Sequence, residues 1–182
     1  MTGSLFSTLL ADREDRQRSS CVQGVRFAEV REITDQGYIL TWLSGNVSSP
    51  SAPARAASFM AGAERGAYFP FEVGDEVVVG FEEGNLDVPV ILGALWSDVD
   101  APPPDADTSP SNNIRTIRSR EGSEVTFDDT PGATRVLIKS AGGMEVSLDD
   151  KTKKLTIKFD DSASIELSPA GVTVKGSTIN LN

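Results

Sequence analysis

Three pairs of adjacent aspartates are the residues whose type and spacing could do chemistry in this chain. They are Asp128-Asp129, Asp149-Asp150 and Asp160-Asp161, and each pair follows a short apolar segment. Paired carboxylates could bind calcium, which takes six to eight oxygen ligands, or could serve as a general acid and base. Each pair also precedes a short break, where aspartate side chains accept hydrogen bonds from the backbone. We therefore interpret the pairs as turn residues, with metal binding and catalysis as the alternatives.

Composition restricts the other kinds of catalytic and metal chemistry. The 182 residues include no histidine and a single cysteine, Cys21. An imidazole-assisted nucleophile, the usual zinc and haem ligand sets and an internal disulfide cannot be assembled from such a chain. The formal net charge of −10 repels phosphate backbones and anionic lipids. We expect no cofactor, no metal, no nucleic-acid partner and no enzymatic activity.

The elements that must position the aspartates form a ladder of short segments from Val125 to the last residue. Apolar residues recur two apart and are separated by turn residues, which predicts strands with one buried face. Two buried side chains, at about 1.5–3 kcal/mol each, barely offset the entropy of ordering a strand and its turn. Such strands need regular neighbours, as in a stacked solenoid or an intertwined oligomer. The apolar pairs are Val125/Phe127, Val136/Ile138, Val146/Leu148, Leu155/Ile157, Ile165/Leu167, Val172/Val174 and Ile179/Leu181.

The chain before the ladder divides into three parts. Residues 1–20 have apolar side chains at helical spacing and predict a short amphipathic helix that packs on its own domain or on another subunit. Residues 21–97 show alternating segments at 22–33, 38–43, 56–60, 76–83 and 88–95, typical of a small Greek-key barrel of the OB type. Residues 98–113 contain three consecutive prolines and predict an extended linker. The ladder domain then occupies 114–182.

The predicted fold class is therefore all-β. An N-terminal OB-fold barrel is followed by a C-terminal β-helix or β-prism, with a short N-terminal helix. The N-terminal apolar run is too short for a secretory signal, and no stretch has the ~18 consecutive apolar residues of a membrane span. We expect a protein that is made in the cytoplasm.

One stretch of the barrel region, residues 69–96, carries a specific motif. It reads FPFEVGDEVVVGFEEGNLDVPVILGALW and resembles the OB-domain signature of the phage baseplate assembly protein V and VgrG spike family. Further segments, IRSREG at 117–122, VTFDDTPG at 125–132 and GMEV at 143–146, also resemble this family. The residues that carry the OB signature are Pro70, Gly74, Asp75, Gly84, Pro89, Gly93 and Trp96.

The resemblance implies a homotrimeric central spike of a contractile injection machine, made in the bacterial cytoplasm and built into a phage tail or a phage tail-like particle. It implies an OB collar, a prism that pierces the target envelope on firing, and a separate baseplate hub protein at the OB end. Simple spikes of this family end in a histidine-containing apex that holds iron, whereas this chain ends GSTINLN. By analogy, a PAAR-type tip protein is expected on Thr178, Ile179, Asn180, Leu181 and Asn182.

The ladder favours a trimer independently of the resemblance. Seven segments in one chain give only about two coils of a three-sided solenoid, near the lower limit for a stable repeat protein. Three chains that each supply one strand per layer give a prism of roughly 34 Å. Alternative functions are a monomeric OB-fold binding adaptor and a carboxylate-dependent hydrolase. The side chains expected in the trimer core are Val125, Phe127, Ile138, Val146, Leu148, Leu155, Ile157, Ile165, Leu167, Val172, Val174, Ile179 and Leu181.

Overall fold

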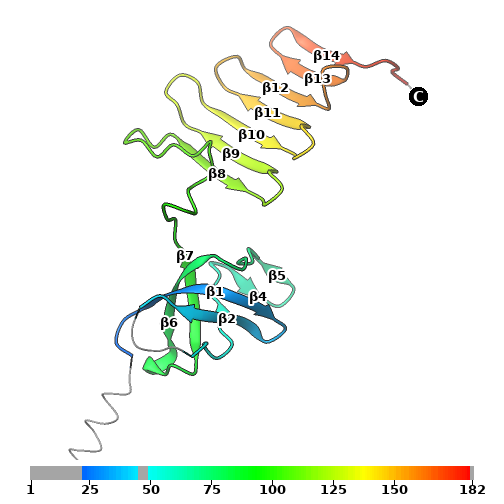
Figure 1. Ribbon diagram of the computed structural model, residues 1–182. Coiled ribbons are helices and arrows are strands. Elements are labelled where there is room, and N and C mark those ends of the chain that lie inside the picture. Colours follow the sequence, from blue (N-terminus) through cyan, green and yellow to red (C-terminus); the bar gives the residue numbers. More distant parts are fainter. Residues whose placement is uncertain (1–21, 45–48, 181–182) are drawn as a thin grey trace, which may run out of the picture. The chain divides into compact units, whose positions relative to one another are not determined.

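The computed structural model describes residues 22–44 and 49–180. These residues form fourteen strands and one 3₁₀ helix, η1 (Glu82–Gly84), so the all-β fold class expected from the sequence is confirmed (Figure 1). The chain divides into a first unit that ends at Ala101 and a second unit that begins at Pro102. The helix expected over residues 1–20 lies outside the described residues. Within the described part, no helix is long and apolar enough to cross a membrane.

The first unit is a small barrel. Its five-stranded sheet has the order β2-β1-β6-β7-β3, with antiparallel pairs except for β3, which runs parallel to β7. An isolated bridge between Tyr38 and Ala54 joins the segment before β3 to β2, which closes the barrel. The strands of this sheet are β1 (Arg26–Thr34), β2 (Gly37–Trp42), β3 (Arg55–Ala56), β6 (Glu76–Phe81) and β7 (Pro89–Ala94).

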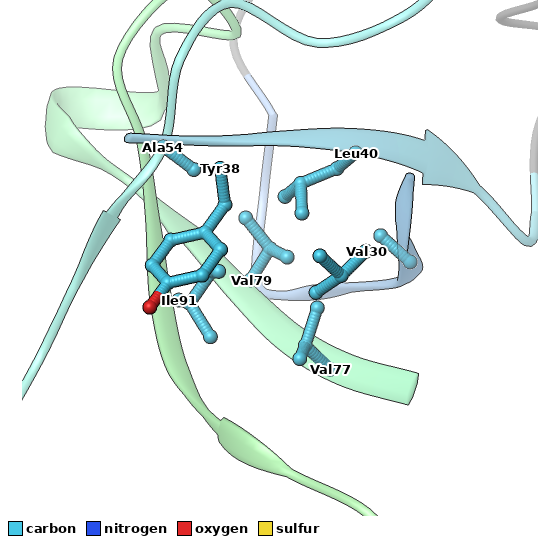
Figure 2. Packing of buried hydrophobic residues seen from close by; sticks show 8 residues of the cluster. Val30, Tyr38, Leu40, Ala54, Val77, Val79 and Ile91 are labelled. Atoms are coloured by element: carbon cyan, nitrogen blue, oxygen red, sulfur yellow. The ribbon is translucent and has the colours of Figure 1, made fainter. Parts of the chain in front are cut away.

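The core of the barrel is built from alternate positions of these strands. Its side chains lie together in the interior (Figure 2), and most are fully buried because period-two alternation turns every second residue inward. The ring of Phe71 packs edge-on against Tyr38, with 5.6 Å between ring centroids, and the Phe71 N–H donates to the Tyr38 hydroxyl at 3.3 Å. The buried cluster consists of Ala28, Val30, Tyr38, Leu40, Ala54, Val77, Val79 and Ile91.

The third segment of the barrel differs from the sequence-based prediction. A strand was predicted over 56–60, but β3 ends at Ala56, and the chain then leaves the sheet for a hairpin of β4 (Ala61–Gly62) and β5 (Arg65–Gly66). The Ser58 hydroxyl donates to the carbonyl oxygens of Met60 and Ala67, and this side-chain bonding replaces a continued ladder with β7.

The second unit is a seven-stranded antiparallel meander in which each strand pairs with its sequence neighbours (Figure 1). Seven segments were predicted, but the last of them, Ile179/Leu181, is wrong: Ile179 lies in no strand, and Leu181 lies outside the described residues. The seventh strand is instead β8, where Arg115 interrupts the apolar alternation. The strands are β8 (Ile114–Arg118), β9 (Glu124–Asp128), β10 (Arg135–Lys139), β11 (Glu145–Asp149), β12 (Lys154–Lys158), β13 (Ser164–Ser168) and β14 (Gly171–Lys175).

The segment before β8 is held against this sheet by hydrogen bonds. The Asn113 N–H donates to Asp107 Oδ2 at 2.8 Å, and the Asn113 carbonyl oxygen accepts the Asp129 N–H at 2.9 Å. Asp105 Oδ2 lies 3.2 Å from Arg118 Nη1. The later part of the predicted linker, residues 105–113, is therefore bonded to the strands of the second unit.

Candidate functional site

The aspartate pairs lie at the ends of strands or just after them, and they bond to the turns that follow. Asp128 Oδ1 accepts the Thr130 N–H at 3.0 Å, and Asp149 Oδ1 accepts the Thr152 N–H at 2.7 Å. Asp160 Oδ1 accepts two backbone N–H groups, from residues 162 and 163, at 2.7 and 3.1 Å. These bonds confirm that the first aspartate of each pair is a turn residue.

The same hydrogen bonds set the protonation of these carboxyl groups. Hydrogen bonds from Thr130 lower the pKa of Asp128, and the backbone N–H of Thr152 lowers the pKa of Asp149. Hydrogen bonds from Ser162 likewise lower the pKa of Asp160. A general acid at neutral pH requires a raised carboxyl pKa, so these three aspartates are poorly suited to that role. Among the described residues, no three Asp, Glu, His or Cys side chains are grouped so that they could hold a metal ion.

The most distinctive surface of the second unit is one face of its sheet. The strand register aligns alternate residues of the seven strands into two rows, and thirteen of the fourteen side chains are apolar. We call these two rows together the apolar face. Row A contains Arg115, Phe127, Val136, Leu148, Leu155, Leu167 and Val172, and row B contains Ile117, Val125, Ile138, Val146, Ile157, Ile165 and Val174.

The apolar face is open in the single chain. Along β12 and β13, Ile157 keeps 45% of its surface exposed, and Leu167 keeps 43%. The opposite face is more deeply buried at β9, where Glu124, Thr126 and Asp128 are each less than 9% exposed. A sheet that buries carboxylates and leaves its aliphatic side chains in water has the polarity of a subunit interface. A second surface is needed to cover this face.

The opposite face carries charges that alternate from strand to strand. The two ends of β9 and of β11 are acidic, whereas the two ends of β10 and of β12 are basic. The strand register therefore places opposite charges side by side, as in the pair of Arg135 Nε with Asp128 Oδ2 at 3.1 Å. Arg118 Nη1 likewise lies 2.8 Å from Glu124 Oε2. We did not predict this pattern, although the strand sequences EVTFD, RVLIK, EVSLD and KLTIK contain it.

Comparison with known protein families follows the same division of the chain. Residues 35–96 match the type VI secretion system/phage-baseplate injector OB domain, and residues 115–182 match the phage baseplate V C-terminal trimerisation domain. Together the matches cover more than two thirds of the chain. The chain belongs to the phage baseplate V family of spike proteins. A search of curated proteins finds no match to it.

Membership of the baseplate V family confirms the resemblance noted in the sequence and supports a homotrimer, because the matched C-terminal domain is a trimerisation domain. The chain is thus a baseplate spike component of a phage tail or related injection particle. Its family is one of structural baseplate proteins, which argues against catalysis by the aspartate pairs.

The structure places eleven of the thirteen residues expected in the trimer core on the apolar face. Of the other two, Ile179 lies beyond β14, and Leu181 is outside the described residues. The expectation omitted Ile117 and Val136, which occupy the same rows. Val136 had been recognised within the ladder, whereas Ile117 is flanked by arginines and gives a weaker signal.

The residues of the OB signature shape the turns around β6 and β7 of the baseplate V barrel. Gly74 has a φ of +103°, and its N–H donates to Val30 O at 2.8 Å before Asp75 caps the turn through a 2.8 Å bond from the Glu72 N–H. The remaining signature positions divide by location. Pro70 precedes this turn, Gly84 ends η1 with a φ of +78°, Pro89 begins β7, Gly93 lies at a register shift between β6 and β7, and Trp96 is 68% exposed.

Proposed function

We propose that the protein is the homotrimeric central spike of a contractile injection machine, in which three copies bury their apolar faces around a common axis. The observation that carries this proposal is the apolar face itself, which has thirteen apolar side chains, nine of them between 39% and 68% exposed. Three such faces pack into a closed prism, and seven strands at ~4.8 Å spacing give it a length of roughly 34 Å. Hydrophobic burial then stabilises the sheet and the trimer together.

The proposed trimer core comprises the face residues predicted from the sequence. Strands of five residues are too short to be stable alone, so fold and assembly are coupled. The resulting object is stiff and narrow, and its role is mechanical: it concentrates the force of contraction on a small area of the target envelope. A catalytic step is not part of this proposal.

The two ends of the spike are proposed to bind different partners. A baseplate hub protein is proposed to seat the OB end, and a PAAR-type tip protein is proposed to bind the C-terminal end at Thr178, Ile179 and Asn180, together with residues 181 and 182. The support for the tip seat is that, among the described residues, β14 pairs only with β13, so its other edge offers backbone groups for a partner. Ile179, at 51% exposure, lies beyond β14 and lines a hollow together with Ile165 and Val174, so it offers an apolar contact at this end of the ladder.

Assembly of the trimer is tested by replacing Leu167 and Val174 with aspartate. We expect sedimentation velocity to show monomers, because six carboxylates would be buried around the axis. The matched control replaces Thr173, which lies between them on the polar face, with aspartate and should remain trimeric. An intact trimer for the double variant would refute the burial of this face.

The tip seat is tested by the substitution Ile179→Asp in the full chain. Co-purification with a co-expressed PAAR-type protein should be lost, whereas Thr173→Asp should retain it. Sedimentation of the same samples establishes that the variant is still a trimer. Retained co-purification of Ile179→Asp would refute the proposed seat and would leave the trimer proposal standing.

A further inference from the structure

The ends of the seven strands form two opposite sides of the sheet, which we call its lateral edges, and these two sides are not alike. Because the strands form a meander, the connections alternate between the edges. Connections 129–134, 150–153 and 169–170 lie on one edge, which we call the groove edge. Connections 119–123, 140–144 and 159–163 lie on the other, which we call the Phe159 edge. Row A borders the groove edge, and row B borders the Phe159 edge.

The groove edge contains an apolar hollow of about 500 Å³. Its floor is formed by Leu148, Leu155 and Leu167, one from each of β11, β12 and β13, so the hollow is centred on β12. Its rim is formed by polar connections that include Asp150. Leu148 and Leu167 keep 44% and 43% of their surface exposed, so the floor of this hollow is only partly buried in the single chain.

The opposite edge carries a projecting aromatic side chain at the same level. Phe159 follows the last residue of β12 and continues its alternation, so its ring lies on the apolar face beside Ile157 and Ile165. It is held in place by a hydrogen bond from its N–H to the Ala163 carbonyl oxygen at 3.0 Å. The side chain nevertheless remains 63% exposed. An exposed phenylalanine on an ordered turn is an unfilled contact.

We propose that in the assembled spike the Phe159 ring of each copy inserts into the Leu148/Leu155/Leu167 hollow of the adjacent copy. This inference rests on the trimer described under the proposed function, and it specifies which surfaces meet between neighbours. Phe159 cannot fill the hollow of its own chain, because a five-residue strand holds the two edges about 17 Å apart.

Threefold symmetry and the height of Phe159 along the axis determine which side chain fills the hollow. Rotation about a threefold axis keeps every residue at its own height, so the Phe159 edge of one copy meets the groove edge of the next with β12 beside β12. A contact between two different edges is heterologous, and three such contacts close a ring. A Phe side chain buries about 150–250 Å², and aromatic side chains seated in pockets are the typical anchors of interfaces.

Disulfide trapping tests the contact in the full chain with Cys21 replaced by serine. The test pair is Phe159→Cys with Asp150→Cys, since residue 150 is on the groove rim one strand spacing, about 5 Å, from the level of β12. The control pair is Phe159→Cys with Asp129→Cys, on the same groove edge but three strand spacings, about 14 Å, away. Oxidation of the test pair should give covalent dimers and trimers and no larger species, and the control pair should remain uncross-linked.

A second measurement does not depend on cross-linking. Phe159→Ala should weaken trimer association by roughly a hundredfold or more by sedimentation, and Phe159→Leu should restore most of it. Wild-type trimer affinity for Phe159→Ala, absence of cross-linking between trimeric test-pair chains, or covalent species larger than a trimer would each overturn the contact and leave the proposed function intact. A monomeric unsubstituted protein would overturn both proposals.

Discussion

Substitution of Ile157 by alanine should weaken the trimer by an amount that depends on how much of the Ile157 side chain is exposed in the single chain. Ile157 lies near the middle of row B and is 45% exposed in the single chain, so about half of its burial remains to be gained on assembly. Full burial of an isoleucine side chain is worth about 1.5–3 kcal/mol, which leaves roughly 0.7–1.4 kcal/mol per copy. Three copies meet at one level, and the trimer therefore loses roughly 2–4 kcal/mol, before any cavity at the axis is counted.

The assay is sedimentation velocity over a wide range of protein concentration, together with thermal unfolding at the same concentrations. A loss of 2–4 kcal/mol weakens the overall association constant by about 30- to 1,000-fold, because 1.4 kcal/mol corresponds to a factor of ten. The unfolding midpoint should also become more dependent on concentration.

The matched control is Thr156→Ala, one residue earlier on the opposite face. A surface truncation of this kind changes stability by no more than about 0.5 kcal/mol. If Thr156→Ala weakened the trimer as much as Ile157→Ala, or if neither changed it, the assignment of the inward face would be refuted.

Three further substitutions test the turns, the barrel and the charged face. Asp160→Asn keeps an acceptor oxygen but cannot titrate. The pKa of Asp160 is lowered in the folded protein, so the stabilisation from its carboxylate is present above pH ~4 and is lost as the pH falls through the lowered pKa. In thermal unfolding, the variant should therefore lose less stability between pH 5 and pH 2 than the unsubstituted protein. Gly37→Ala should destabilise the barrel by roughly 2 kcal/mol or more in denaturant unfolding. The reason is that Gly37 has a φ of +136° and an added Cβ would lie 2.4 Å from the Ala54 carbonyl oxygen. The control Gly93→Ala places its Cβ in open space and should be nearly neutral. Arg118→Met keeps the aliphatic stem but leaves the buried Glu124 carboxylate without its charged partner. The free energy of unfolding should fall by about 1–3 kcal/mol. An unchanged value would mean that the Arg118–Glu124 pair contributes nothing to stability.

Much of the ladder could be predicted from the sequence because its signal is local. Each strand is five residues long, and all but one of the turns between them contain glycine or aspartate, so the period of the apolar residues and the turn residues predict the same strand boundaries. The prediction failed at both ends of the ladder. At β8 Arg115 occupies an apolar position, and at Ile179 an apolar residue is present without a continuing strand.

The strand pairing in the barrel and the contact between copies were harder to predict from the sequence. The parallel contact of β3 with β7 and the Tyr38–Ala54 bridge join residues far apart in the sequence, and two-residue strands carry no periodic signal. The hollow on the groove edge exists only once β11, β12 and β13 lie side by side in one register. Phe159 could be recognised in the sequence as an apolar residue beside an aspartate pair, but the sequence does not show that it stands on the opposite edge from that hollow.

The meander, with its charges alternating from strand to strand, also determines how the length of such a spike can change. Insertion of a single strand would reverse the edge on which every later connection lies and would place like charges next to each other. Insertion of a hairpin, with one acidic-ended and one basic-ended strand, preserves both patterns and adds about 10 Å. The length of the ladder can therefore change in hairpin-sized steps, without altering the sequence of the barrel or of the terminal strand.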